Sequence, residues 1–363
     1  MKLFLHFRTL VMHFFDLFCE FSCKCLYCIF ILFILIGCLG ITACSPSGSS
    51  NPISVSSYCL NTMISITIYD SNDTQLLDEC LSMCDRYEKI FSRTDTESEL
   101  YRLNHGLLTQ DSYGYYTVSA QLYDLIKIGK EYSQISDDTF DIAMEPLTSL
   151  WDFSSGENNV PDNAAILEVL PFLNSDDILL QEPNKVAFAQ DNMGIDLGAI
   201  AKGYIADCLK EYLLSQNVNS AVIDLGGNVL CIGQKQDVPF KIGIQKPFAD
   251  RGKTAAVINI SDKSVVSSGI YERYFEKDNT LYHHILDKNT GYPVKTDIVG
   301  VTVITDSSVK ADALSTTCLS LGLSKGLALI NQTPNADAVF ITSDNRLHFS
   351  DDFPKEYAVT ITP

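Results

Sequence analysis

The segment Gly194-Ile-Asp-Leu-Gly-Ala-Ile-Ala-Lys-Gly-Tyr204 is the part of this chain that best predicts a fold. Its first residues predict an apolar strand that ends at Asp196, and the rest predicts a helix that begins near Gly198 with Lys202 in its first turn. The free N–H groups and positive dipole at a helix N-terminus suit a phosphate group. Gly198 and Ala199 are small enough to let a phosphate or a metal ion approach the backbone. An ordinary turn between a strand and a helix is the alternative.

Helix and strand patterns are mixed along the whole chain after residue 58. The segment 62–69, TMISITIY, has the two-residue apolar period of a half-buried strand. Apolar residues at helical spacing predict helices at 74–91, at 119–134, from about 198, and at 308–322. Further strands are predicted at 220–225, 239–245, 255–260, 299–305, 337–342 and 357–362. Because strict βα alternation is missing, we expect an α+β fold with mixed strands and helices, formed by residues 58–363 as one unit of two lobes.

The first 43 residues have the composition of an export signal. An uncharged run of 18 residues, Leu26–Ala43, follows a segment with three cations. This length lies at the lower limit of a membrane span and also fits a secretory signal. Ile41-Thr42-Ala43-Cys44 resembles a bacterial lipobox, in which the cysteine is acylated and the chain is cut before it. We therefore predict a signal peptide at 1–43 and a lipid on Cys44, with an uncleaved anchor helix as the alternative.

Small, polar and uncharged residues follow, and they predict a flexible linker at 44–57. The domain would then be anchored by lipid to the outer, extracytoplasmic face of the cell membrane. The formal net charge of −19 argues against nucleic acid and anionic lipid as partners. Six of the twelve cysteines lie at or before Cys44, and the others have no zinc-type spacing. Cys80 and Cys84 share a helical face with leucines, so we interpret them as core residues.

Two segments contain residue types that suit proton transfer and metal binding. In Tyr282–Pro293, His283 and His284 would point to opposite faces of a strand, one toward a site and one toward solvent. A histidine near Asp287 is a plausible proton-transfer pair, and a hairpin with incidental histidines is the alternative. Asp312 and Thr316 are four residues apart and share a helical face, where their oxygens would suit Mg²⁺. A helix cap is the alternative for Asp312.

Two further segments are less specific. The segment 139–153 contains the only tryptophan of the chain and is most simply explained as core aromatics. The glycine pair in Asp224-Leu-Gly-Gly-Asn228 suits either a turn or a close approach to a ligand.

The order of these segments is more informative than any one of them. The chain reads LNTMISITIY at 60–69, FSRT at 91–94 with SELYRLN at 98–104, FDIAMEPLTSLWDF at 140–153, IDLGAIAKGY at 195–204, DLGGN at 224–228, SSGIYER at 267–273 with HHILDKNTGYP at 283–293, and ADALSTT at 311–317. This series resembles the ApbE family from about residue 58 to 325. Family members are FAD:protein FMN transferases, and many are lipoproteins.

The resemblance implies roles for individual positions. It implies that Mg²⁺ is held by the carbonyl oxygen of Ala199 together with Asp312 and Thr316. His284 matches the residue that acts in transfer. The remaining matches are to positions that contact FAD: Leu60, Thr94, Thr139, Phe140, Asp141, Asp196, Lys202 and Leu286.

The chain departs from the family pattern at three places. Leu60-Asn61-Thr62 stands where many members read Met-Gly-Thr, and Asn61 is less favourable than glycine if its φ is positive. Thr94 stands where many members have an aromatic residue that covers the flavin, so FAD could be held more loosely or hydrolysed. Lys288 replaces a usual proline, a change that we expect to be neutral.

The implied reaction moves FMN from FAD to a Thr or Ser hydroxyl of an acceptor flavoprotein, expected to be a membrane redox subunit, and releases AMP. Mg²⁺ would neutralise charge on the diphosphate, and His284 would accept the hydroxyl proton with Asp287 as its orienting partner. Two alternatives remain: an FAD pyrophosphatase, in which water replaces the acceptor, and a flavin-binding lipoprotein without catalysis.

Overall fold

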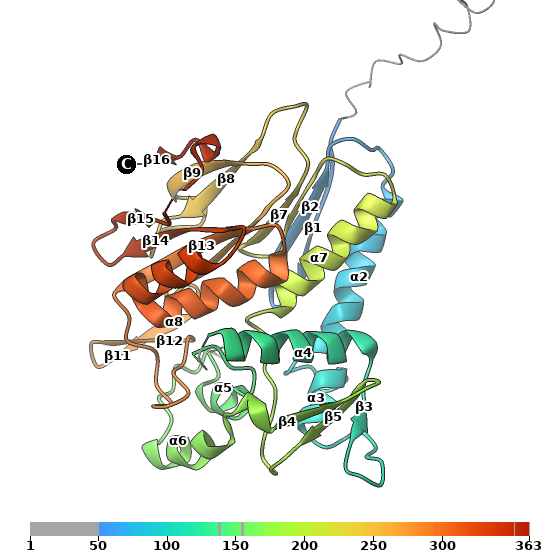
Figure 1. Ribbon diagram of the computed structural model, residues 1–363, viewed down its shortest axis with the longest axis vertical. Helices are drawn as coiled ribbons and strands as arrows, with labels where there is room; N and C mark the ends of the chain where they lie inside the picture. Colours follow the sequence, from blue (N-terminus) through green and yellow to red (C-terminus); the bar gives the residue numbers. More distant parts are fainter. Residues whose placement is uncertain (1–50, 137–138, 154–155, 352, 363) are drawn as a thin grey trace, which may run out of the picture. The chain divides into compact units, whose positions relative to one another are not determined.

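The computed structural model describes residues 51–136, 139–153, 156–351 and 353–362 (Figure 1). The predicted signal peptide and Cys44 lie outside these residues. The fold is α+β, as predicted, and its centre is an eight-stranded sheet in which all neighbouring strands are antiparallel. The strand order is β1 (Ile53–Cys59), β2 (Thr62–Ile68), β6 (Ala221–Asp224), β7 (Asn228–Ile232), β10 (Ser264–Gly269), β13 (Ile298–Thr305), β14 (Ala336–Thr342) and β15 (Leu347–Phe349).

The two-residue period of the central strands places one apolar set on each face of this sheet. Val303 and Phe340 pack with Leu314 of helix α8 (Ser308–Gln332) on one face. Ile304 and Val339 pack on the other face with strands of a second sheet, ordered β16 (Thr360–Ile361), β9 (Thr254–Ile260) and β8 (Phe240–Gln245). The central strands are therefore covered on both faces.

Further helices and short strands complete the fold (Figure 1). Helices α2 (Gln75–Phe91) and α7 (Ala201–Ser215) pack against each other. The remaining elements are α3 (Glu99–Asn104), α4 (Ala120–Ile135), α5 (Glu145–Trp151), α6 (Asn163–Val169), a sheet of β3 (Tyr116–Thr117), β5 (Lys185–Phe188) and β4 (Ile178–Gln181), the hairpin β11 (Tyr274–Lys277) with β12 (Thr280–His283), and 3-10 turns at Leu170–Phe172, Ser175–Asp177 and Lys355–Tyr357.

Helix α7 holds the start of helix α8 through two residues. Gly203 touches the backbone of the first turn of α8, since a Cβ there would lie 2.5 Å from the carbonyl oxygen of Ser308. One turn later, the Asp207 carboxylate accepts hydrogen bonds from the N–H groups of Ser308 at 2.8 Å and Val309 at 3.0 Å. A side chain from one helix thus caps the other, which fixes the two helices against each other.

Several sequence predictions are wrong in detail. The segment before Asp196 is not a strand, because the Asn104 side chain satisfies both the N–H and the carbonyl of Ile195, each at 2.8 Å. The linker prediction fails for 53–57, which belong to β1 and pair with β2. The predicted strand 357–362 is reduced to Thr360–Ile361. Helix α8 runs ten residues past 322, although Gly322 (φ 78°) kinks it there.

The core interpretation of the cysteines is confirmed. Cys80 and Cys84 are fully buried on α2, and neither forms a disulfide with another described residue. Helix α8 has the length and apolarity of a membrane span, but half of its most apolar window is buried in the fold. This burial fits a core helix.

Candidate functional site

The candidate site is a cavity of about 430 Å³. Its wall is formed by the β1–β2 turn, the end of α2, the segments before α5 and α7, the β6–β7 turn, β10, the residues after β12, and α8. The structure brings every predicted site residue that it describes to this one cavity: Leu60, Thr94, Thr139, Phe140, Asp141, Asp196, Ala199, Lys202, His284, Leu286, Asp312 and Thr316.

Asp312 and Thr316 of α8 both line the cavity. Asp312 is only 4% exposed, and its Oδ2 accepts a hydrogen bond from the N–H of Gly203 at 2.9 Å. Burial raises the pKa of the Asp312 carboxyl, although the charge of Lys202 and the Gly203 N–H oppose this. No described residue forms an ion pair with Asp312. A buried carboxylate, a hydroxyl and a backbone carbonyl at Ala199 are hard oxygen ligands, so this donor set fits Mg²⁺.

Asp196 is paired with Arg93, a residue that the sequence analysis did not single out. Arg93 Nε lies 3.0 Å from Asp196 Oδ2, and both side chains are mostly buried. Asp196 Oδ1 accepts a hydrogen bond from the N–H of Gly198 at 2.8 Å. Arg93 also donates to the Ser149 hydroxyl at 3.3 Å. Asp196, the predicted flavin contact, is therefore a carboxylate held in place by an ion pair. Arg93 could have been found from the sequence because it directly precedes Thr94, a predicted site residue.

The replacement of the usual proline by Lys288 was expected to have no effect, but the structure gives this lysine a specific contact. Its ammonium lies 2.8 Å from Asp141 Oδ2, and the Asp141 side chain is 1% exposed. The Asp141 carboxylate also accepts hydrogen bonds from the N–H groups of Ala143 at 2.8 Å and Ser175 at 3.3 Å. The lysine that replaces the usual proline therefore compensates a buried charge and joins the turn after Leu286 to the 139–143 segment.

His284 lines the cavity as a neutral imidazole. Its Nδ1 lies 3.2 Å from the carbonyl oxygen of Arg273 and must donate to it, which leaves Nε2 as a proton acceptor. Burial, then the charges of Arg273 and Lys202, lower the pKa of His284 to about 3. His283 is 5% exposed rather than solvent-facing as predicted, because β12 packs its side chain inward, and burial lowers its pKa to about 4.

The predicted pairing of His284 with Asp287 is wrong. Asp287 caps the following turn instead, where its Oδ1 accepts from the N–H of Asn289 at 2.9 Å and its Oδ2 accepts from the Thr290 hydroxyl at 3.2 Å. The orienting group of His284 is the backbone carbonyl of Arg273. A backbone partner leaves no signature in the residue types, so the sequence could not reveal it.

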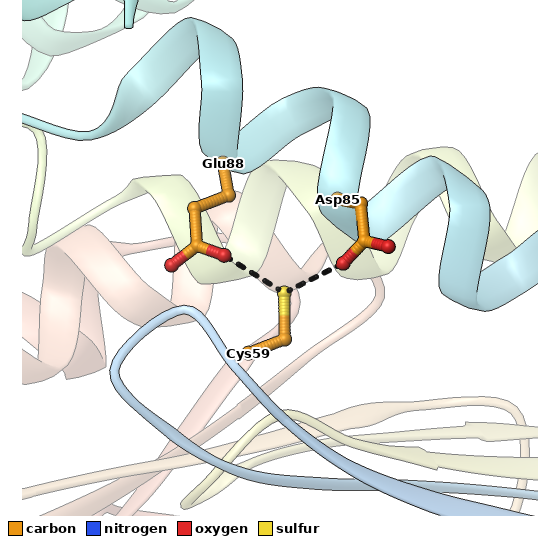
Figure 2. A group of neighbouring side chains, drawn as sticks. All are labelled: Cys59, Asp85 and Glu88. Carbon is orange, nitrogen blue, oxygen red and sulfur yellow. Dashed lines mark hydrogen bonds between the residues drawn. The ribbon is translucent and has the colours of Figure 1, made fainter. Parts of the chain in front are cut away.

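The β1–β2 turn is clamped at the cavity by Glu88 of α2 (Figure 2). Glu88 accepts hydrogen bonds from the N–H of Leu60 at 3.1 Å and from the Cys59 thiol at 3.3 Å. Burial and the neighbouring carboxylates raise the pKa of Cys59, so its thiol keeps the proton that it donates. Leu60 and Asn61 have φ values of 55° and 56°, as the concern about Asn61 anticipated. The clamp holds this left-handed backbone in place.

The two less specific segments contribute differently. Trp151 is core, as predicted, with 2% exposure and its indole N–H donating to the carbonyl of Gly291 at 2.8 Å. Phe153 stacks on Trp151 and also lines the cavity. Gly226 and Asn228 line it too, and Gly226 (φ 71°) has no room for a Cβ, which would lie 2.2 Å from Thr62 Oγ1.

Cationic side chains are concentrated at this cavity although the chain has a net charge of −19. Arg251 and Arg273 join Lys202 in its wall. Within the described residues, no carboxylate forms an ion pair with any of these three. Cations that are not held in close ion pairs favour an anionic ligand such as a diphosphate. Neither arginine was assigned a role from the sequence: Arg273 ends the family-like segment SSGIYER at 267–273, and Arg251 lies in a loop between β8 and β9.

Comparison with known proteins gives consistent matches. The model of the ApbE family matches residues 60–340. A protein of Klebsiella pneumoniae (strain 342) named FAD:protein FMN transferase is 37% identical over 306 residues, which cover 82% of this chain and 94% of that protein. A protein of the same name from Treponema pallidum (strain Nichols) is 32% identical over 330 residues, or 86% of this chain and 90% of that protein.

Solved structures agree with the fold. The ApbE protein of Thermotoga maritima superposes with a TM-score of 0.75 at 29% identity, over 84% of this chain and 98% of that chain. The flavin transferase ApbE of Vibrio cholerae, 24% identical, shares the fold with a TM-score of 0.73 over 84% of this chain and 98% of that chain.

Proposed function

This chain belongs to the ApbE family, and from that membership we propose that it transfers the FMN part of FAD to a Thr or Ser hydroxyl of an acceptor protein. The observation that carries the proposal is the meeting of Lys202, His284 and Asp312 in one cavity, although they lie on three separate segments. A protein without a catalytic role would not need the buried Asp312 carboxylate near Lys202, nor a neutral His284 in the wall of the same cavity.

Different residues of the cavity would bind the metal, the diphosphate and the flavin. Asp312, Thr316 and the carbonyl oxygen of Ala199 would hold Mg²⁺, which when bound neutralises charge on the diphosphate. Lys202 adds a positive charge beside them. The Arg93–Asp196 pair and the 139–141 segment form the part of the wall where the flavin would lie. The protein's main contribution is therefore to position the reactants and to stabilise developing charge.

His284 provides the proton acceptor. The acceptor hydroxyl attacks the FMN-side phosphorus, its proton passes to His284 Nε2, and the bond from that phosphorus to the AMP oxygen breaks. Because Nδ1 is committed to the Arg273 carbonyl, the imidazole presents the correct nitrogen without a change of tautomer. AMP then leaves with the electron pair of the broken bond.

The proposal is tested by incubating the enzyme with FAD, Mg²⁺ and candidate membrane flavoproteins. Transfer should give a fluorescent acceptor band in a denaturing gel, and mass spectrometry should find one FMN on a Thr or Ser residue. The same protein treated with EDTA is the control and should give no band. FMN and AMP released in equal amounts, with every acceptor unlabelled, would contradict the proposal and identify a pyrophosphatase.

Hydrolysis of FAD is the second candidate function because Thr94 is exposed at the cavity wall and covers little flavin surface. Without an acceptor, we expect slow release of FMN and AMP. Thr94→Tyr should reduce this release severalfold and leave transfer nearly unchanged, because a ring over the flavin excludes water. Thr94→Ser is the matched control and should hydrolyse FAD like the wild type. AMP and protein-bound flavin, measured in parallel, decide this, and unchanged AMP release from Thr94→Tyr would contradict it.

We further propose that Cys44 carries the lipid anchor and that the acceptor is a membrane redox subunit on the same extracytoplasmic face. The lipobox-like sequence supports this. In cells fed a fatty-acid analogue, the wild type should be labelled and Cys44→Ala should not. The Cys59→Ala variant is the control and should remain labelled, since Cys59 is buried. Equal labelling of wild type and Cys44→Ala would rule the anchor out.

A further inference from the structure

Arg93 lies in a turn whose backbone is held by hydroxyl groups. The turn follows helix α2, and the Ser92 hydroxyl accepts hydrogen bonds from the N–H groups of Thr94 at 3.3 Å and Asp95 at 3.1 Å. The Ser98 hydroxyl donates to the carbonyl oxygen of Ser92. These bonds fix the backbone from which the Arg93 side chain enters the cavity wall.

The Arg93 guanidinium joins two other segments of the chain. Its Nε lies 3.0 Å from Asp196 Oδ2, and its Nη1 donates to Ser149 Oγ at 3.3 Å. Ser149 belongs to α5 and donates in turn to Glu145 Oε1 at 2.6 Å. Because a guanidinium is planar and rigid, two partners on different sides leave it little freedom to turn. Arg93 therefore connects the segment before α7 to α5 and holds Asp196 between them.

The Asp196 carboxylate keeps acceptor capacity for a ligand. An ionised carboxylate has about four acceptor sites. Within the described residues, Arg93 occupies one of them at Oδ2 and the N–H of Gly198 occupies one at Oδ1. Asp196 lines the cavity, and 17% of its side chain is exposed. A hydrogen-bond donor of a ligand in the cavity can therefore be bound there.

The Arg93–Asp196 pair carries no net charge, unlike Lys202, Arg251 and Arg273 in the same wall. Those three cations suit the diphosphate of FAD. The isoalloxazine ring is uncharged, and one edge of it has an N3–H donor between two carbonyl oxygens. A carboxylate can accept from N3–H, and a cation beside the carboxylate cancels the charge that would otherwise repel the diphosphate of the same ligand.

We propose that Arg93 is a positioning residue for flavin recognition, which holds Asp196 so that its carboxylate accepts a hydrogen bond from N3–H of the isoalloxazine ring. This inference rests on the proposed function. An acceptor that is already oriented in the free protein needs no reorganisation when the flavin arrives. Arg93 acts through Asp196 and not by contact with the reacting atoms.

Discrimination between FAD and 3-methyl-FAD, in which a methyl group replaces the N3 hydrogen, tests the proposal. Flavin fluorescence should show that the wild type binds FAD about 10- to 100-fold more tightly, the range for a hydrogen bond to a charged group. In Arg93→Met this ratio should fall severalfold, because Asp196 is no longer held. A variant that only loosens the fold would bind both ligands more weakly by the same factor. An unchanged ratio in Arg93→Met, or a ratio near one in the wild type, would overturn the proposal.

Two further variants identify the partner and the role of the charge. Asp196→Ala should remove the discrimination, and a wild-type ratio in this variant would show that another group binds N3–H. Arg93→Lys keeps the cation but cannot reach both partners as the guanidinium does, so its ratio should be intermediate. If circular dichroism shows that Arg93→Met does not fold, Arg93→Lys carries the test, and a ratio equal to that of the wild type would overturn the assignment.

Arg86 provides the matched control. It lies on α2 and pairs with Glu79 at 2.8 Å, and both side chains are largely exposed outside the cavity wall. Arg86→Met should therefore leave the affinities for FAD and 3-methyl-FAD unchanged. A fall in the ratio as large as that of Arg93→Met would contradict a role specific to Arg93.

These outcomes are separable from those of the proposed function, because affinity can be measured whether or not FMN is transferred. A wild type that binds FAD but labels no acceptor, with a ratio that depends on Arg93, would refute transfer alone. A wild type that labels its acceptor, with the same ratio in Arg93→Met, would refute the role of Arg93 alone.

Discussion

Replacing Asp312 by alanine should lower the rate of FMN transfer by about 10³-fold or more while the protein still folds. A metal ion at a phosphoryl centre contributes several kcal/mol, and each 1.4 kcal/mol is about tenfold in rate. The fold should survive because two effects offset each other. The N–H of Gly203 loses its acceptor, but a buried carboxylate with a raised pKa is removed.

Thr316→Val is the graded comparison, since it removes a neutral ligand of similar shape and should cost less than Asp312→Ala. Transfer is measured after chelator treatment, with Mg²⁺ titrated back, and circular dichroism reports folding. Transfer by Asp312→Ala at the wild-type rate throughout the Mg²⁺ titration would show that the metal is held elsewhere or is not needed.

Replacing His284 by alanine should slow transfer by about 10²- to 10⁴-fold, the usual contribution of general base catalysis. FAD affinity should change little, because Lys202, Arg251 and the Asp312 side chain remain in the wall. Stopped assays of acceptor labelling at saturating FAD measure the rate, and flavin fluorescence measures affinity. His283→Ala is the neighbouring control, which should lower stability rather than the rate per folded molecule, since His283 is buried outside the cavity wall.

The pH profile gives an independent check on His284. A base with its pKa lowered to about 3 is neutral throughout pH 5–8, and only protonation below that range removes it. Transfer per unit of free enzyme, kcat/KM, should therefore show no histidine inflection near pH 6.5. An inflection near 6.5 that disappears in His284→Ala would show that His284 titrates normally.

The pH dependence of stability should carry the signature of His283. Its folded pKa of about 4 lies below the ordinary value of 6.5, so the unfolded chain binds more protons between these values. The stabilisation is complete above about pH 6.5 and is lost as the pH falls toward 4. Denaturant unfolding at pH 7 and pH 5 should show a smaller loss for His283→Gln than for the wild type, and identical losses would contradict this.

The sequence predicted the long helices and the alternating burial of β2 well, because both follow from apolar spacing between residues that are close in the chain. The helical spacing of Asp312 and Thr316 is such a case, and α8 does present both to the cavity. Residue types and spacing suggested a phosphate or metal site only weakly, and family resemblance supplied most of the individual roles.

What the sequence could not predict depends on partners far away in the chain. Asn104 replaces strand pairing at Ile195, 91 residues away, and no local pattern reveals this. Arg93 and Lys288 acquire their importance from Asp196 and Asp141, which only the folded chain brings near. The start of β1 was missed because small polar residues precede it and mask its alternation.

If Cys44 carries the proposed lipid anchor, the early start of β1 would limit how far the enzyme can act from the membrane. With a lipid on Cys44, only the eight residues Ser45–Pro52 separate the anchor from the first strand. A fully extended chain of this length spans about 30 Å. The catalytic domain would then be confined to a thin layer at the bilayer surface. An acceptor anchored in the same membrane would be present there at a high effective concentration, whereas the anchor would not raise the effective concentration of an acceptor free in solution. Substrate choice would then be decided partly by geometry, through the height of the acceptor's hydroxyl above the lipid.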